Sequence, residues 1–239
     1  MSEAQYKRVL IKVSGEALAS DKKTGLDFDF ITRVANSVKE CADKGVEIGI
    51  VVGGGNFWRG VKDGGGKVER TRADYMGMLA TTMNALALAD VLQGVGVDAV
   101  VQTAIDMVKI AEPYTRNKAV AHLKKGRVVI FACGTGNPFF STDTGAVLKA
   151  AEIGAEVILL AKNIDGVYDA DPAKVKDAKK FDSITYDEVL ARGLAVMDTA
   201  ATALAKENNI PVIVFAVKDP DNITRVLCGE KIGSYVGVK

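Results

Sequence analysis

The stretch that decides the fold lies at residues 128–153 and reads VVIFACGTGNPFFSTDTGAVLKAAEI. Its first part, Val128 to Cys133, is a continuous apolar run, as expected of a strand that is buried on both faces. Its last part, Thr144 to Ile153, has a helix-like composition. The loop between them is rich in glycine and hydroxyl residues and is longer than a strand–helix connection needs. The stretch therefore predicts a strand, an anion-accepting loop and a helix N-terminus, followed by its helix.

The same alternation of strand and helix continues along the chain. Strands are expected over residues 7–13, 46–52, 97–103, 127–133, 156–161 and 211–216. Helices are expected over residues 28–42, 74–92, 114–124, 144–153, 195–206 and 222–227. This order predicts an α/β three-layer sandwich with a mostly parallel central sheet and helices on both faces. No repeat or proline-rich linker divides the sequence, so one domain over residues 1–239 is expected.

The composition argues against several classes of protein. The 31 basic and 30 acidic residues leave a net charge of +1, so no nucleic-acid partner is expected. No apolar run of membrane-spanning length and no secretion signal is seen, so no membrane partner is expected either. The cysteines Cys41, Cys133 and Cys228 are odd in number and widely spaced, which favours reduced thiols in the cytoplasm. The single histidine, His122, is expected at the surface.

Three glycine-bearing motifs follow three predicted strands. They are Lys12-Val13-Ser14-Gly15, Gly53-Gly54-Gly55 and the loop from Gly134 to Thr142. The carboxyl ends of parallel strands share one edge of a sheet, where ligands of such folds bind. Glycine also lets a phosphate approach the backbone closely. Together the motifs indicate an enzyme that handles nucleotides.

Charged residues beside these motifs have two possible interpretations each. Lys12 could place an ammonium group on a phosphate or could extend into solvent from the sheet edge. Arg59 could offer its guanidinium group to phosphate oxygens or could be an exposed loop residue. Asp143 could cap the helix that follows it, or it could orient lysines or a metal-bound phosphate.

Two further segments carry similar alternatives. Asp74 could begin and cap the long helix, or it could bind a ribose hydroxyl. The segment from Asp165 to Pro172 could be a plain turn, or Tyr168 and Asp171 could border an adenine or a ribose. The sequence has no Gly-x-x-x-x-Gly-Lys-Ser/Thr motif and no Gly-x-Gly-x-x-Gly after the first strand, which excludes P-loop kinases and leaves a dinucleotide site unsupported.

Taken together, the motifs resemble those of bacterial uridylate (UMP) kinases, which belong to the amino acid kinase superfamily. The resemblance covers nearly the whole chain. The motifs that carry it are Lys12–Leu18, Gly53–Gly60, Asp74–Thr81, Gly134–Asp143, Asp165–Tyr168, Ala170–Pro172 and Val196–Asp198. It implies the amino acid kinase fold, transfer of a phosphoryl group from ATP to UMP with Mg²⁺, and a homohexamer.

The resemblance also implies roles for single residues. The catalytic residues would be Lys12, Arg59 and Asp143, with Asp143 organising lysines around the moving phosphoryl group. ATP would be bound by Lys12, Val13, Ser14, Gly15, Gly55, Arg59, Lys162, Asn163, Tyr168 and Asp171. UMP would be bound by Gly54, Asp74, Thr135, Gly136, Asn137, Pro138, Phe139, Phe140, Ser141 and Thr142. Thr135 and Asn137 are expected to select uracil, and no residue is assigned as a metal ligand.

The sequence departs from the family pattern at two places. Asn163 stands where many members have a lysine, and Lys162 precedes it, so either could contact ATP. Ser20 to Gly25 replaces a Gly-Phe-Gly loop that is linked to activation by GTP, which leaves GTP activation and UTP inhibition as family expectations.

Two other functions stay open: a nucleotide store or sensor without transfer activity, and a kinase for a carboxylate, a carbamate or an isoprenoid phosphate. The Gly134–Thr142 loop argues against the latter.

Overall fold

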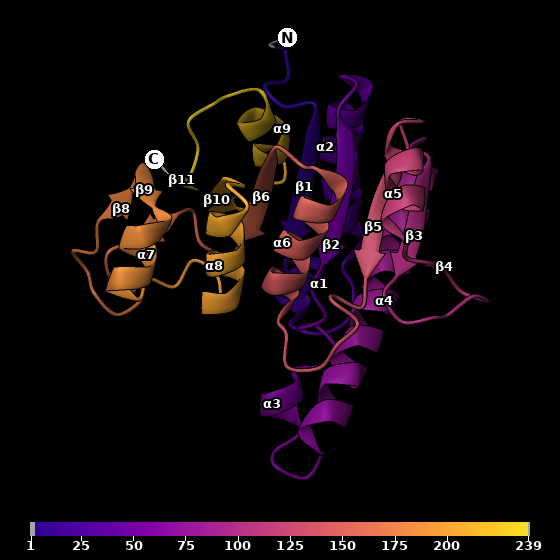
Figure 1. Cartoon of the computed structure of the whole chain (residues 1–239), viewed down its shortest axis with the longest axis horizontal. Coiled ribbons are helices and arrows are strands. Elements are labelled where there is room, and N and C mark those ends of the chain that lie inside the picture. The colour runs from indigo at the N-terminus through magenta and orange to yellow at the C-terminus, as the bar shows by residue number, and fades with distance from the viewer. Residues whose placement is uncertain (1–2, 239) are drawn as a thin grey trace.

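The computed structural model describes residues 3–238, and in that range the central sheet has nine strands (Figure 1). Their order across the sheet is β4-β3-β5-β2-β1-β6-β10-β11-β9. The strands are β1 (Arg8–Val13), β2 (Glu47–Val52), β3 (Ala99–Thr103), β4 (Glu112–Pro113), β5 (Val128–Ala132), β6 (Val157–Lys162), β9 (Ser183–Thr185), β10 (Val212–Ala216) and β11 (Ser234–Gly237). All neighbouring pairs are parallel except β10 and β11, which confirms the predicted mostly parallel sheet.

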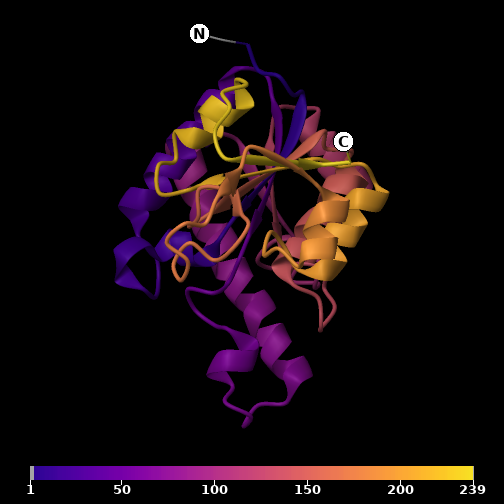
Figure 2. The same cartoon turned by 90° about the vertical axis from the view of Figure 1, so that its left-hand side faces the viewer.

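Helices cover both faces of this sheet, as predicted (Figure 2). One face carries α1 (Gly15–Ala19), α2 (Phe28–Asp43), α4 (Arg70–Gly94) and α9 (Asn222–Leu227). The other face carries α5 (Arg116–Leu123), α6 (Thr142–Ile153), α7 (Tyr186–Arg192) and α8 (Thr199–Glu207). A 3-10 turn, η1 (Ser20–Lys22), follows α1, and α3 (Gly60–Asp63) precedes α4. A small antiparallel pair, β7 (Val167–Tyr168) and β8 (Lys180–Phe181), lies outside the main sheet.

The alternating faces of β1 show how the sequence produces the three layers. Val9 and Ile11 are fully buried in one hydrophobic core together with Val34 of α2. Leu10, between them, is buried in a second core together with Val147 of α6. Because successive strand residues point to opposite faces, a continuous apolar strand fills both cores at once.

The helix expected from Asp74 to Leu92 begins earlier than predicted. Helix α4 starts at Arg70, and Glu69 is its N-cap, with a carboxylate that accepts a hydrogen bond from the Thr71 N–H. Asp74 is therefore inside the helix and does not cap it. By length and composition α4 is the one helix in residues 3–238 that could cross a membrane, but half of its apolar window is buried inside the protein, as in a core helix.

Other boundaries also differ from the sequence predictions. The helix expected over 195–206 begins at Thr199, because Asp198 accepts a hydrogen bond from the Ala201 N–H and so caps it. The short helices α1, α3 and α7 were not predicted, because each has too few residues to show a helical apolar period. His122, expected at the surface, is partly exposed there, and its ring lies 3.1 Å from the Glu112 carboxylate.

Candidate active site

The three glycine-bearing motifs lie at the carboxyl ends of β1, β2 and β5, which are neighbours in the sheet. The first two motifs touch each other through backbone. A Cβ atom added to Gly15 would lie 2.6 Å from the Gly53 carbonyl oxygen and 2.7 Å from Asn56 Oδ1. Only glycine permits this approach, which brings the N-terminus of α1 against the Gly53–Gly55 loop.

The buried side chains of Asn56 and Asn84 hold this loop in place. The Asn84 amide nitrogen donates to the Gly53 carbonyl at 2.6 Å and to Asn56 Oδ1 at 2.7 Å. The Asn56 amide nitrogen donates to Asn84 Oδ1 at 2.9 Å and to the Gly25 carbonyl at 2.7 Å. Helix α4 thus holds the glycine loop through hydrogen bonds that are shielded from water.

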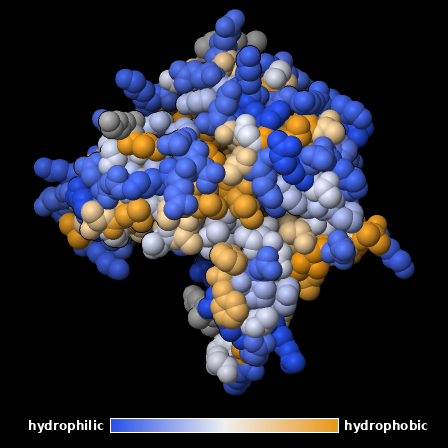
Figure 3. All heavy atoms as spheres, in the orientation of Figure 1, coloured by the Kyte–Doolittle hydropathy of each residue, from blue (hydrophilic) through white to orange (hydrophobic). Residues whose placement is uncertain are grey.

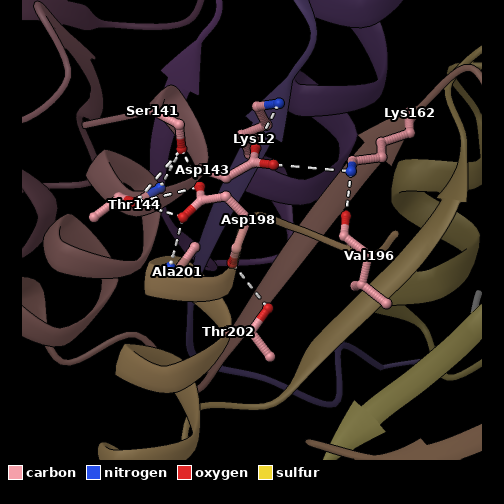
Figure 4. Close-up of polar contacts among 9 residues, drawn as sticks. All are labelled: Lys12, Ser141, Asp143, Thr144, Lys162, Val196, Asp198, Ala201 and Thr202. Carbon is pink, nitrogen blue, oxygen red and sulfur yellow. Dashed lines mark hydrogen bonds and ion pairs between the residues drawn. The ribbon is translucent and has the colours of Figure 1, made fainter. Parts of the chain in front are cut away.

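A cluster of opposite charges lies at the end of β1. The Lys12 ammonium group is 2.8 Å from Asp143 Oδ1, and the Lys162 ammonium group is 3.8 Å from Asp143 Oδ2 (Figure 4). Lys12 is only 8% exposed, so this ion pair is weakly screened by water. Burial lowers the pKa of Lys162 below its ordinary value, an effect that the nearby Asp143 opposes. Two cations therefore stand on either side of one carboxylate.

The helix-cap interpretation of Asp143 is wrong. Ser141 caps α6, because its hydroxyl accepts a hydrogen bond from the Thr144 N–H at 3.1 Å. Asp143 is the second residue of the helix, and its carboxylate faces the two lysines instead of the backbone. The first turn of a helix is also where a negative side chain is favoured by the helix dipole.

A cavity of about 440 Å³ opens beside this cluster. It lies between the Gly54–Gly60 segment, the first turns of α4, the Gly134–Thr142 loop and the start of α8. Of the residues predicted to bind UMP, those that line it are Gly54, Asp74, Thr135, Phe139, Phe140, Ser141 and Thr142. Gly136, Asn137 and Pro138 are in the same loop but are not part of the cavity wall.

Asp74 connects two walls of this cavity. Its carboxylate accepts a hydrogen bond from the Phe139 N–H at 2.8 Å and pairs with Arg70 at 2.8 Å. Phe139 has a positive φ of 72°, an unfavourable conformation for a residue with a side chain. Gly136, with φ 78°, turns the loop without that cost. Asp74 thus stabilises a strained part of the loop.

A second cavity, of about 340 Å³, lies on the other side of the lysines. Lys12, Ser14, Lys162 and Asn163 line it, so four residues predicted to bind ATP share one space. Thr142 and Thr144, on either side of Asp143, line the first cavity, whereas Lys12 and Lys162 line the second. The charge cluster therefore stands where the two cavities approach each other.

The remaining residues predicted to bind ATP do not line the second cavity, and one of them, Gly55, lines the first. Arg59 pairs with Glu16, and its Nε donates to the Gly55 carbonyl at 3.4 Å. Val13 is the buried end of β1. Tyr168 donates a hydrogen bond to Asp165, and Asp171 accepts one from the Ala173 N–H, so neither lines the second cavity.

Sequence reasoning gave no role to Glu16, Asn84 or Asp198. Trp58 and Asp198 line the first cavity, and Glu16 holds Arg59. The Val196–Asp198 motif was part of the family resemblance, but an aspartate before a helical segment is ordinarily explained as an N-cap. A buried asparagine pair leaves no sequence signal, because its partners come from different elements.

The described residues include no group of three or more His, Cys, Asp or Glu side chains that could hold a metal ion. Asp143 faces two lysines, and Asp198 accepts hydrogen bonds from two hydroxyl groups. This donor set does not form a protein-held metal site. It is compatible with Mg²⁺ that arrives with a nucleotide, because such an ion keeps phosphate and water ligands.

Comparison with known proteins gives the family of the chain. Residues 7–216 match the amino acid kinase family. The chain is similar to the crystal structure of UMP kinase from Bacillus anthracis, with 39% identity, a TM-score of 0.93 and coverage of 97% of this chain and 96% of that one. It is also similar to UMP kinase from Ureaplasma parvum (37%, TM-score 0.91, coverage 99% and 100%) and to uridylate kinase from Archaeoglobus fulgidus (28%, TM-score 0.77, coverage 96% and 99%). The chain belongs to the amino acid kinase family.

Proposed function

We propose that this protein transfers the terminal phosphoryl group of ATP to UMP and releases ADP and UDP. The observation that carries the proposal is the Lys12–Asp143–Lys162 cluster between two cavities. It occurs on a chain that matches UMP kinases over nearly its full length. The cavity lined by the Gly134–Thr142 loop would take UMP, and the cavity lined by Ser14 and Asn163 would take the ATP phosphates.

The mechanism requires position and charge more than covalent chemistry by the protein. The attacking atom would be a phosphate oxygen of UMP, which is already an anion and has no proton to lose. Asp143 is therefore assigned to hold and orient Lys12 and Lys162, not to act as a base. The two ammonium groups would stabilise the negative charge on the moving phosphoryl group.

Arg59 would add a third positive charge when ATP binds. Its guanidinium group pairs with Glu16, and both side chains are more than 40% exposed. Such an exposed pair contributes little energy, so a phosphate group can replace Glu16 as the partner. Ser14, Gly15 and Gly55 would offer backbone N–H groups to the same phosphates.

Recognition of UMP would rest on the loop from Thr135 to Thr142, together with Gly54 and Asp74. Thr135, which lines the cavity, would present a polar group to the uracil edge. Asn137, which is hydrogen-bonded to Thr135, would do so from just outside the present cavity wall. On the ATP side, Lys162 and Asn163 would lie near the phosphates, and Tyr168 and Asp171 would reach the base or ribose after movement of the β7–β8 segment. Mg²⁺ would enter with ATP and neutralise phosphate charge.

We further propose that the chain forms a single domain that works as a homohexamer in the cytoplasm. Self-association is supported by exposed apolar residues at helical spacing on α4, namely Met76, Leu79 and Met83. Val108 and Ile110, in the loop before β4, are exposed as well. Figure 3 shows hydrophobic residues at the surface on the right of the molecule, among hydrophilic ones. Activation by GTP and inhibition by UTP remain proposals from the family, since Ser20–Gly25 departs from its pattern.

The test is an assay of ADP release with ATP and Mg²⁺, in which UMP, CMP, dUMP and AMP are offered separately. We expect rapid turnover with UMP. CMP and AMP should show at least about tenfold lower kcat/KM, because unpaired polar groups at the base edge are costly. dUMP has the same base edge as UMP, so its lower kcat/KM should come instead from the ribose 2′-hydroxyl that Asp74 would no longer bind. Equal turnover with CMP would contradict the role of the Thr135–Thr142 loop. Binding of UMP and ATP without turnover would favour a nucleotide store or sensor.

A further inference from the structure

Asp198 receives more hydrogen bonds than a helix cap needs. It caps α8 by accepting from the Ala201 N–H at 3.0 Å. Its carboxylate also accepts from the Ser141 hydroxyl and from the Thr144 hydroxyl, the latter at 3.2 and 3.3 Å to the two oxygens. Figure 4 shows the Asp198 carboxylate between α8 and the start of α6, pointing toward both hydroxyl groups.

Ser141 and Thr144 stand on either side of Asp143 in the sequence. The Ser141 hydroxyl accepts from the Thr144 N–H and donates its own proton to Asp198. Asp198 therefore directs the Ser141 hydroxyl so that its lone pair faces the helix, and it holds Thr144 at the same time. The first turn of α6, which carries Asp143, is fixed against α8 by one carboxylate.

The chain just before Asp198 supports the second lysine. The Val196 carbonyl oxygen accepts a hydrogen bond from the Lys162 ammonium group. The Asp198 carbonyl oxygen accepts from the Thr202 hydroxyl at 3.0 Å, which anchors the segment on α8. Residues 196–198 thus contact both sides of the charge cluster, Lys162 directly and Asp143 through its helix (Figure 4).

We propose that Asp198 is a positioning residue for phosphoryl transfer, which fixes the start of α6 so that Asp143, Ser141 and Thr142 hold the UMP side of the site. The proposal rests on the proposed function. It predicts that loss of the bridge affects UMP and turnover more than ATP, because Asp198 lines the first cavity and not the second.

The experiment separates the bridge from the helix cap. Asp198→Ser keeps a good N-cap for α8, but its short hydroxyl cannot also reach Ser141 and Thr144. Asp198→Asn keeps the cap and a polar group long enough to reach both hydroxyl groups. Thr144→Val removes one partner with little change of shape. Asp27→Ser is the matched control, because Asp27 caps α2 by accepting from the Asp29 and Phe30 N–H groups.

We expect Asp198→Ser to lower kcat/KM for UMP by at least about tenfold while KM for ATP changes by less than about twofold, since small displacements of reacting groups are costly. Asp198→Asn should recover most of this loss, and Asp27→Ser should show none of it. The double variant, Asp198→Ser with Thr144→Val, should show a smaller loss of kcat/KM for UMP than the product of the two single losses, because both substitutions remove the same bridge.

Three results would overturn the proposal: kcat/KM for UMP near the wild-type value in Asp198→Ser, equal changes in KM for UMP and ATP, or independent effects in the double variant. An inactive wild-type protein would instead refute the proposed function itself. Wild-type turnover of UMP with an unaffected Asp198→Ser variant would refute the positioning role alone.

Discussion

Asp143 has a cationic side chain on each side of its carboxylate, and this is the residue-scale feature on which the reaction depends. The pairing could be anticipated only in part. The sequence placed Lys12 and Asp143 after strands whose ends share an edge, and the family resemblance suggested that they meet. The Lys162 contact and the approach of Val196 depend on the path of the chain beyond β6, which local sequence does not encode.

Asp143→Asn and Lys12→Ala should each lower kcat by at least about a hundredfold, the scale seen when one preorganised charge-stabilising group is lost. UMP binding should partly survive in both, and can be followed by the fluorescence of Trp58, the only tryptophan, which lines the UMP cavity. Asp43→Asn, in an exposed ion pair on α2, is the control and should leave kcat unchanged. Full activity in both site variants would refute the assignment.

The pH dependence of kcat should reflect the ionisation of Lys162. Burial lowers the pKa of Lys162, so its ammonium group loses its proton at a lower pH than an ordinary lysine. We expect kcat to fall on the alkaline side before the ordinary lysine range is reached, and Lys162→Arg to shift that fall to higher pH. The effect on stability has the opposite sign. Between the lowered pKa of Lys162 in the folded protein and its ordinary pKa in the unfolded chain, the unfolded chain binds more protons. The contribution of this group to the free energy of unfolding therefore increases as the pH rises through that range. An alkaline limb that Lys162→Arg does not move would contradict the assignment.

At the scale of elements, helix α4 is both a core helix and the support of the glycine loop. Its start was misjudged because the apolar pattern begins after Ala73, whereas the cap at Glu69 lies in a polar segment. The polar Asn84 inside this apolar helix gave no sequence signal of its contact with Gly53. Strand positions were easier to predict, since the buried strands β1, β2, β5 and β6 are continuous apolar runs.

Asn84→Ala should therefore destabilise the protein and disturb the loop. The substitution leaves the Gly53 carbonyl and both polar ends of the Asn56 amide without this partner, at a cost of about 1–3 kcal/mol in the free energy of unfolding. Asn208→Ala, at the exposed end of α8, should have little effect. Thermal unfolding of the two variants measures the difference, and equal melting temperatures would show that the asparagine pair adds nothing.

At the scale of the whole molecule, the fold class was predicted because alternating apolar runs and helices leave few other arrangements. The antiparallel strand β11 and the outer strand β9 are short and lie at one edge, where sequence patterns are weak. The apolar surface on α4 was expected from its composition, and Leu79 and Met83 are about half exposed there. Such a surface on one chain favours contact with a second copy.

Leu79→Glu with Met83→Glu should lower the mass of the assembly in solution, because four buried carboxylates would face one another across a two-fold contact in place of apolar side chains. Light scattering coupled to size-exclusion chromatography measures the mass. Val175→Glu, at an exposed apolar residue away from α4, is the control and should keep the wild-type mass. A monomeric wild-type protein would remove the proposal of self-association.

The most direct test of the central claim is chromatographic measurement of UDP and ADP formed from UMP and ATP, since release of ADP alone would also follow from hydrolysis of ATP. Transfer through the Lys12–Asp143–Lys162 cluster predicts one UDP for each ADP, and loss of both products in Asp143→Asn. ADP without UDP, or neither product from a folded protein that binds both nucleotides, would contradict the claim.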